Sequence, residues 1–248
     1  MNAMFNPEIV KSKNICPEHK TQMIVMFGRE TCPACAVAYV NASNQAHAKQ
    51  VDQAVREKHF AGAMLPKRHE NSGFRNYTTE LPGQKLALKQ TTDYAKEIIK
   101  GAVTNLVMVG STGTGKTHLA CATARTLLAK GMYARYITSE DMAQKIMKAW
   151  DKDTKDQSEQ SVIYDFTQYD LLILDEYGLH DRDKRLELVH KVLYSRYDDG
   201  KSTMLISNMT LDQLKNDLGD RLWSRFQHGG LSVVECSWMD GRVQGGAA

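Results

Sequence analysis

The segment Gly110-Ser-Thr-Gly-Thr-Gly-Lys-Thr117 decides the fold of this chain. It matches the pattern GxxxxGK[ST], and it stands directly after the apolar run Leu106–Val109 and before a helix-forming segment, the context that gives this pattern meaning. The glycines let the backbone curl so that its N–H groups point inward and form an anion-binding nest at a helix N-terminus. We therefore expect phosphates to be bound by Gly110, Ser111, Thr112, Gly113, Thr114, Gly115, Lys116 and Thr117.

A second segment, Leu171-Leu-Ile-Leu-Asp-Glu176, supplies what such a loop needs. In the loop, Lys116 is predicted to reach the β- and γ-phosphates, and Thr117 to complete the shell of a Mg²⁺ ion. Mg²⁺ also requires carboxylate support, and the apolar run predicts a buried strand that delivers Asp175 to the ligand-binding edge of a sheet. We expect Asp175 to support Mg²⁺ and Glu176 to polarise the attacking water. The alternative is a pair of surface carboxylates after a core strand.

The residues around Asp175 also bear on which nucleotide base is bound. Asp175-Glu-Tyr-Gly178 also satisfies the DxxG pattern of GTPases, but no segment matches the Asn-Lys-x-Asp guanine reader of those proteins. The residue pattern therefore favours ATP over GTP.

Short apolar runs alternate with helical segments after residue 105, which is typical of an α/β domain with a mainly parallel sheet. Helices are expected over Gln84–Lys100, Thr117–Lys130 and Asp141–Trp150, the last with Thr138 or Ser139 as N-cap. The polar run 151–160 is predicted to be a solvated loop. The five predicted strands are Leu106–Val109, Ala134–Thr138, Leu171–Leu174, Thr203–Ser207 and Ser232–Glu235.

Two further segments carry polar side chains whose role depends on the strand order. Asn208 ends the run Thr203-Met-Leu-Ile-Ser, and it would point at the γ-phosphate or the water if that strand lies between the other two; an Asn here is otherwise a turn former. Arg221 and Arg225 lie in a segment that can simply be an amphipathic helix with solvated arginines.

The N-terminal region contains paired metal-ligand residues. Cys16-Pro-Glu-His19 and Cys32-Pro-Ala-Cys35 are separated by twelve residues, enough for a short hairpin. Two such turns can close a tetrahedral Zn²⁺ site, and a closed four-ligand shell is structural rather than catalytic. About thirty residues cannot build an adequate core alone, so a metal would stabilise the module. Unrelated loop thiols beside a solvated histidine are the alternative. Cys121 and Cys236 are expected in the core.

Composition, apolar runs and charge bear on the class of protein, its cellular location and its division into domains. The chain has 248 residues, 42% hydrophobic and 25% charged, which is ordinary globular usage. No apolar run approaches the roughly 20 residues of a membrane span, and no secretory signal is readable, so we expect a cytoplasmic protein without a membrane partner. Residues 1–75 carry ten Lys/Arg against six Asp/Glu, a bias that permits contact with nucleic acid. The expected division is a zinc-binding module with its helix at 1–61, a linker at 62–73, and an ATPase domain at 74–248.

The motif series resembles the AAA+ ATPases of the DnaC helicase-loader family, a group that includes DnaI and IstB. The segments that carry the resemblance are GSTGTGKTHLA, LLILDEYG, ISN and LGDRLWSRF, preceded by Phe74-Arg-Asn-Tyr77. It implies an AAA+ P-loop fold, with Gly110 to Thr117 as Walker A, Asp175 and Glu176 as Walker B, and Asn208 as sensor 1. Arg221 and Arg225 match the motif of the arginine finger, which acts on the ATP of a neighbouring subunit; we favour Arg221. Arg242 is a substitute for a sensor 2 arginine.

The resemblance also implies partners. It predicts a loader that binds a hexameric replicative DNA helicase and single-stranded DNA during replication initiation, and that self-associates through its ATP interface. The helix Ser139–Trp150 would contact DNA through Lys145, Lys148 and Trp150, or else it is amphipathic with its apolar side and Trp150 packed. Two other functions remain open: a transposition helper ATPase of the IstB type, and a zinc-dependent DNA-binding adaptor whose nucleotide site is only a switch.

Overall fold

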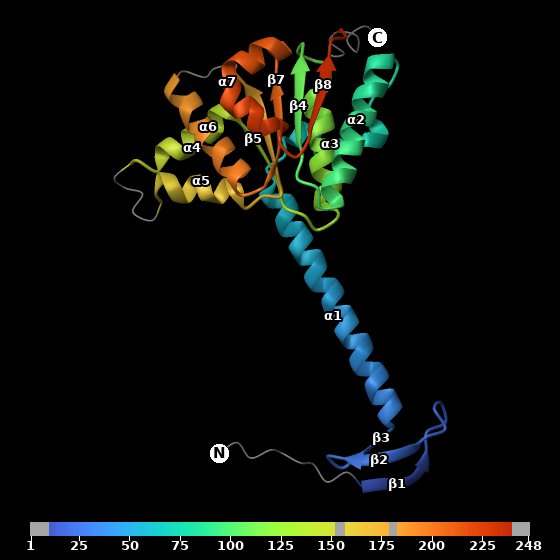
Figure 1. Ribbon diagram of the computed structural model, residues 1–248. Helices are drawn as coiled ribbons and strands as arrows, with labels where there is room; N and C mark the ends of the chain where they lie inside the picture. The colour runs from blue at the N-terminus through green and yellow to red at the C-terminus, as the bar shows by residue number, and fades with distance from the viewer. Residues whose placement is uncertain (1–9, 152–156, 179–182, 240–248) are drawn as a thin grey trace. The chain divides into compact units, whose positions relative to one another are not determined.

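The computed structural model describes residues 10–151, 157–178 and 183–239 (Figure 1). Contacts divide the chain between Val55 and Arg56 into two compact units, and each is described by itself. The predicted boundaries after residues 61 and 73 stay a prediction.

The first unit contains a small antiparallel sheet of strands β1 (Val10–Ile15), β2 (Gln22–Met26) and β3 (Arg29–Thr31). Phe27 and Gly28 join β2 to β3, and both have positive φ, as a tight hairpin turn requires. Helix α1 (Pro33–Gly62) begins directly after β3 and carries no buried residue. The predicted hairpin between the two metal-ligand pairs is therefore present, and the helix predicted for this module follows it.

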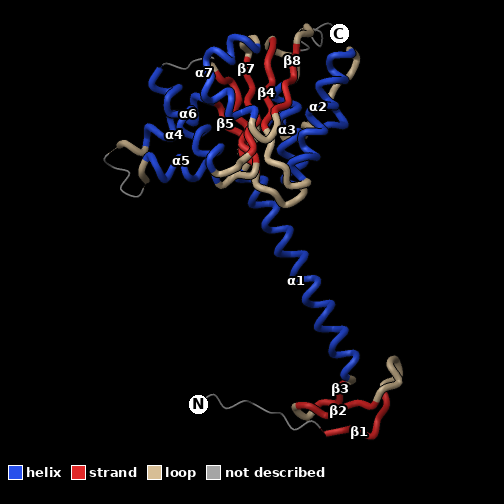
Figure 2. Tube along the Cα trace, viewed as in Figure 1, coloured by secondary structure: helices blue, strands red, loops and turns tan. Residues whose placement is uncertain are grey.

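The second unit is built on five parallel strands in the order β5-β6-β7-β4-β8, drawn in red in Figure 2. The predicted α/β fold with a five-stranded sheet is confirmed. Each apolar run identified in the sequence lies within one strand. Their bounds are β4 (Asn105–Gly110), β5 (Ala134–Thr138), β6 (Leu171–Tyr177), β7 (Ser202–Ser207) and β8 (Leu231–Cys236).

Helices cover both faces of this sheet (Figures 1 and 2). Alternate residues of β4 enter different cores: Leu106 and Met108 pack with α2 and α3, whereas Val107 and Val109 pack with α4 to α7. Burial on both faces explains why the strands read as unbroken apolar runs. The helices are α2 (Pro82–Ile99), α3 (Lys116–Leu128), α4 (Ser139–Lys148), α5 (Glu159–Thr167), α6 (Asp183–Asp198) and α7 (Leu211–Gln227).

The observed bounds of two helices differ from those predicted from the sequence. Helix α4 begins at Ser139 and ends at Lys148, two residues earlier at each end than predicted, and Thr138 is its N-cap, accepting a hydrogen bond from the Asp141 N–H. The predicted loop 151–160 is wrong at its end, because Ser158 caps α5 and the helix begins at Glu159. Residues 152–156 of that loop lie outside the described residues.

Both edge strands of the sheet have backbone groups that are bonded to neighbouring segments. On β5, the Tyr136 N–H donates to the Ala63 carbonyl oxygen at 2.9 Å, just after the end of α1. On β8, the Val233 carbonyl accepts a hydrogen bond from Gln90 Nε2 of α2 at 3.1 Å.

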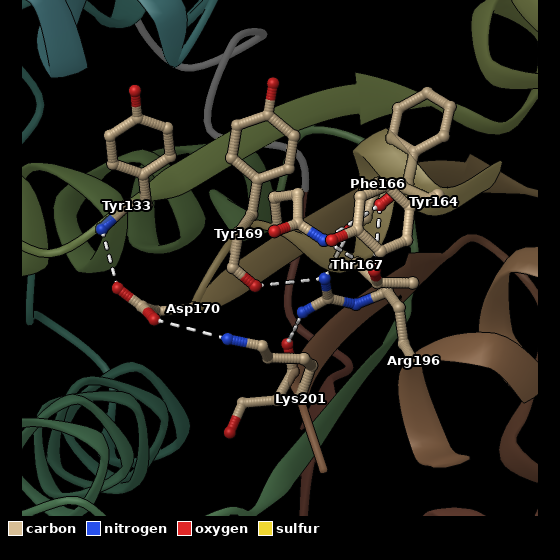
Figure 3. Close-up of polar contacts among 10 residues, drawn as sticks. Tyr133, Tyr164, Phe166, Thr167, Tyr169, Asp170, Arg196 and Lys201 are labelled. Atoms are coloured by element: carbon tan, nitrogen blue, oxygen red, sulfur yellow. Dashed lines mark hydrogen bonds and ion pairs between the residues drawn. The ribbon is translucent and has the colours of Figure 1, made fainter. Parts of the chain in front are cut away.

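A buried arginine holds the edge where the strands begin (Figure 3). Arg196 of α6 is fully buried, and its guanidinium donates to the carbonyl oxygens of Phe166, Tyr169 and Ser202 and to the Thr203 hydroxyl. Burial lowers the pKa of Arg196 to about 9, which still leaves it protonated at neutral pH. Arg196 therefore links the ends of α5 and α6 to the start of β7. These contacts lie at the edge of the sheet opposite the glycine-rich loop that follows β4.

Candidate functional site

The strand order brings three predicted segments to one edge of the sheet. Strand β7 lies between β6 and β4, which is the condition under which Asn208 would face the phosphate loop. The loop follows β4, Asp175 and Glu176 are near the end of β6, and Asn208 follows β7. Since parallel strands end at the same edge, these residues share one surface. Asn208 is exposed there.

The loop between β4 and α3 has the backbone of an anion nest. Gly110, Gly113 and Gly115 have φ values of 124°, 71° and 87°, which side chains other than glycine rarely adopt. A Cβ atom at Gly110 would lie 2.2 Å from the Cys236 carbonyl oxygen, so glycine is required there. Helix α3 begins at Lys116, and its positive dipole end faces the loop.

Lys116 is positioned across this loop. Its side chain is 6% exposed, and Nζ donates to the carbonyl oxygens of Gly110 at 2.7 Å and Ser111 at 2.6 Å. The ammonium group is therefore held inside the curl of the loop, where a phosphate would be bound.

Asp175 is the acceptor at the centre of the site. Its Oδ2 accepts hydrogen bonds from Thr117 Oγ1 at 2.9 Å and from the Tyr136 hydroxyl at 2.8 Å, and its Oδ1 accepts from the Glu176 N–H at 2.7 Å. A hydroxyl and a carboxylate in contact fit a shared Mg²⁺ ion, because hard cations prefer oxygen ligands. The sequence analysis did not identify Tyr136; burial and the Asp175 charge raise its pKa, so it remains a proton donor.

Glu176 lies at an irregularity near the end of β6. The register between β6 and β7 shifts between Leu174 and Tyr177, and Glu176 has a φ of 57°, a left-handed value uncommon for this residue type. Its side chain is exposed, and its carbonyl accepts a hydrogen bond from Ser139 Oγ at 3.1 Å. The two carboxylates differ in exposure: Asp175 is buried beside Thr117, whereas Glu176 is exposed to solvent.

The aromatic residues Tyr77 and Trp238 also contact the loop. The Tyr77 hydroxyl and Trp238 Nε1 both donate to the Thr114 carbonyl oxygen, at 3.2 and 3.0 Å. Sequence reasoning missed this contact, because Tyr77 and Trp238 lie 37 and 124 positions from Thr114.

Comparison with known families agrees with this geometry. The sequence model of the family described as IstB-like ATP binding protein matches residues 39–225. The chain belongs to this family. It is 31% identical to DnaC, the replicative helicase loader of Escherichia coli K12, over 68% of this chain and 69% of DnaC. It is also 31% identical to YdaV of the same organism, over 73% of each chain.

Solved structures show the same architecture. The DnaC helicase loader aligns with a TM-score of 0.59 and 25% identity, over 68% of this chain and 99% of that chain. The replication initiator DnaA, bound to AMPPCP and single-stranded DNA, aligns with a TM-score of 0.56 and 25% identity, over 69% of this chain and 51% of that chain. This IstB-like chain is therefore an AAA+ ATPase, as the motif series predicted.

The two arginines of the LGDRLWSRF segment lie on α7, which is kinked at Gly219. Arg221 is exposed. The Arg225 guanidinium lies over the rings of Tyr194 and Tyr197, 4.7 and 4.9 Å from their centroids, and 4.0 Å from the Asp198 carboxylate.

Arg225 is remote from the phosphate loop of its own chain. It lines a cavity of about 470 Å³ together with Asn105 and Thr203, which lie where β4 and β7 begin. The loop follows the opposite end of β4, one strand length away, about 20 Å at the usual rise of a parallel strand. Arg242, the predicted substitute for sensor 2, lies outside the described residues.

Helix α4 of this IstB-like domain has one buried and one solvated side. Met142 and Ile146 are fully buried, while Lys148 and Trp150 are exposed. The Trp150 indole donates to Glu159 at 2.9 Å, and Lys184 Nζ lies 4.8 Å from the centroid of its ring. Lys145 Nζ lies 5.3 Å from the centroid of the Phe166 ring.

The predicted metal ligands of the first unit are brought together. The ligand atoms of Cys16, His19, Cys32 and Cys35 all lie within 4.8 Å of one another. Cys16 Sγ is 3.8 Å from Cys35 Sγ, and His19 Nδ1 is 3.2 Å from Cys35 Sγ. A tetrahedron with Zn–S bonds of about 2.3 Å has S–S edges of about 3.8 Å, so the cluster fits a zinc-binding module.

The ionisation of the three thiols also fits a cation. Backbone hydrogen bonds from His19 and Glu18 lower the pKa of the Cys16 thiol, and the Thr21 hydroxyl lowers that of Cys32. At Cys35, desolvation and the neighbouring Cys16 and Cys32 raise the pKa to about 12. A cation bound among the three thiols would favour the thiolate form of Cys35.

The remaining sequence predictions concern buried thiols and membrane spans. Cys121 and Cys236 are fully buried, as predicted. No helix among the described residues combines the length and apolar character of a membrane span.

Proposed function

We propose that this chain is an ATP-dependent loader of a hexameric replicative DNA helicase. The observation that carries the proposal is the meeting of Lys116, Thr117, Asp175 and Asn208 at one sheet edge, in a chain 31% identical to DnaC. The cytoplasmic location stays a prediction.

The chemistry follows from the positions of the side chains. Thr117 and Asp175 would hold Mg²⁺, which neutralises phosphate charge when bound. Lys116 and the loop N–H groups would bind the β- and γ-phosphates, Glu176 would orient and polarise the attacking water, and Asn208 would contact the γ-phosphate or that water. Because Asp175 is already held by Tyr136 and the Glu176 N–H, it needs little reorganisation to receive the metal.

An arginine from a neighbouring copy would complete this site. Arg221 and Arg225 both belong to the matching motif, and the sequence analysis favoured Arg221. The stacking of Arg225 on Tyr194 and Tyr197 supports Arg225 instead, because a side chain that is already ordered loses less entropy when it meets a phosphate. ATP would then link adjacent copies.

Substitution of each arginine distinguishes these assignments. Arg225→Ala is expected to reduce ATP turnover at least a hundredfold, because an arginine in trans stabilises charge on the transferred phosphoryl group, while Arg221→Ala is expected to have a smaller effect. Mixing Arg225→Ala with Lys116→Ala protomers should restore part of the turnover. The intact phosphate loop of the first variant can then meet the intact Arg225 of the second. The rate of phosphate release measures ATP turnover in the single variants and in the mixture. Unchanged turnover in the Arg225→Ala protein would exclude it as the finger.

Zinc is proposed as the metal held by Cys16, His19, Cys32 and Cys35. Cys35→Ala is expected to reduce bound zinc from one ion per chain to nearly none and to expose the backbone of β1 to β3, because so small a sheet has little core of its own. Elemental analysis and hydrogen exchange measure the two effects. His47→Ala, at an exposed position of α1, is the control. Full zinc content in the Cys35→Ala protein would contradict the site.

Single-stranded DNA is the second proposed partner. The exposed positions of Lys148 and Trp150 support contact with phosphate and base, with Lys184 displaced from the indole face on binding.

The function is tested by affinity purification of the whole chain with a replicative helicase, with and without ATP and single-stranded DNA. The proposal expects ATP-dependent capture of the helicase. Since the family model that matches is that of IstB-like proteins, a transposition helper remains the second candidate. Capture of a transposase in place of the helicase would favour it.

A further inference from the structure

The carbonyl oxygen of Thr114, in the loop between β4 and α3, accepts hydrogen bonds from two side chains of distant segments. The Tyr77 hydroxyl reaches it from the residue that follows the short 3-10 turn Phe74–Asn76, and Trp238 Nε1 reaches it from the segment after β8. Thr114 itself is 3% exposed, and its hydroxyl donates to the Ser111 carbonyl at 2.9 Å. The outer side of the loop is therefore fixed by three hydrogen bonds.

The Thr114 carbonyl shares a planar peptide unit with the Gly115 N–H. The described residues contain no cis peptide bond, and in a trans unit the C=O and the N–H point in opposite directions. Fixing the carbonyl on the outer side therefore directs the Gly115 N–H to the inner side, where the loop would meet phosphate. Gly115, with φ 87° and ψ 15°, is also the N-cap residue of α3, so this N–H lies at the positive end of the helix dipole.

We infer that Tyr77 and Trp238 are positioning residues that together orient the Thr114–Gly115 peptide for phosphate binding. The inference rests on the proposed nucleotide site and adds two residues that do not themselves touch the phosphates. We call this pair the carbonyl clamp.

Packing holds both members of the carbonyl clamp in place. A Cβ atom at Gly83 of α2 would lie 3.1 Å from the Trp238 ring, and one at Gly115 would lie 2.8 Å from the Tyr77 ring. His118 of α3 contacts the Gly73 carbonyl and the Asn76 side chain at 3.1 Å, which anchors the segment before Tyr77. Burial raises the pKa of the Tyr77 hydroxyl, so it stays a donor throughout the physiological range.

The test removes each donor atom while keeping an aromatic ring at the position. Tyr77→Phe and Trp238→Phe are each expected to weaken binding of Mg²⁺-tripolyphosphate about fivefold, the effect of one net hydrogen bond. The affinity of the double variant for tripolyphosphate is expected to fall by more than the product of the two single-variant factors, because either donor alone can still orient the carbonyl. Calorimetry with inorganic tripolyphosphate and with ATP separates the phosphate contribution from any contact with the base.

Controls separate positioning from folding. Tyr164→Phe, at an exposed position of α5, and Trp223→Phe, on α7, make the same chemical changes elsewhere and are expected to retain wild-type affinity. Thermal unfolding without ligand is measured for all variants. If Trp238→Phe fails to fold, Gly83→Ala, which shifts the indole through its tight contact, is expected to weaken tripolyphosphate binding in its place.

The outcomes are distinct. Wild-type affinity for tripolyphosphate in both donor variants would overturn the carbonyl clamp, and so would a loss confined to ATP, which would mean contact with the base. Failure of the wild-type protein to bind either ligand would instead overturn the proposed nucleotide site.

Discussion

Lys116→Ala is expected to weaken ATP binding by at least about thirtyfold. The Lys116 ammonium is buried within the loop and bonded to the Gly110 and Ser111 carbonyls, so its removal leaves the loop without its only internal cation among the described residues. Truncating one partner of a buried, hydrogen-bonded charge pair costs about 2–5 kcal/mol, which corresponds to a factor of about 30 or more. Isothermal titration with Mg²⁺-ATP measures the change.

A lysine elsewhere provides the matched control. Lys130→Ala removes an exposed lysine just beyond the other end of α3 and is expected to leave the affinity for ATP within twofold. Thermal unfolding without nucleotide should be similar for the two variants. Unchanged ATP affinity in the Lys116→Ala protein would contradict the assignment of the loop.

Glu176→Gln is expected to preserve ATP binding and to reduce hydrolysis at least a hundredfold. The exchange keeps the size of the side chain but removes the carboxylate that would accept a proton from the attacking water, and general base catalysis contributes about 10²- to 10⁴-fold. Because Asp175, and not the exposed Glu176, contacts Thr117, Mg²⁺ binding should be little affected. ATP-loaded assemblies should therefore accumulate, and light scattering with ATP measures their mass.

Glu187→Gln is the control, since Glu187 is an exposed glutamate on α6. Undiminished phosphate release from the Glu176→Gln protein would remove its role as the base. Absence of turnover in the wild-type chain as well would favour an adaptor whose nucleotide site is only a switch.

Much of the fold was predictable because local sequence and global structure agree. Leu106–Val109 and Leu171–Leu174 are apolar without interruption, and strands buried on both faces require this composition. The glycine-rich loop after β4 has positive φ values that glycine allows, and the two ligand pairs around Cys16 and Cys32 come together in one cluster, as their spacing predicted.

The missed features depend on contacts between distant residues. Tyr136, Tyr77 and Trp238 are aromatic residues that a sequence pattern assigns to the core, and only the fold shows that their polar atoms reach Asp175 and Thr114. Arg196 is buried although arginine generally prefers solvent, because its guanidinium is bonded to carbonyl oxygens of two separate segments, residues 166–169 and the start of β7. The positive φ of Glu176 has no local signal, since it follows from the register shift beside β7.

The two edges of the parallel sheet are protected against unwanted pairing. An uncovered edge strand is a template on which another chain can add by backbone hydrogen bonding, and such growth leads to aggregation. Here the Tyr136 N–H is taken by the Ala63 carbonyl, and the Val233 carbonyl is taken by Gln90. A foreign strand would have to displace Ala63, just after the end of α1, on one side or Gln90 on the other, so strand addition at either edge must first break a hydrogen bond that the folded domain already makes.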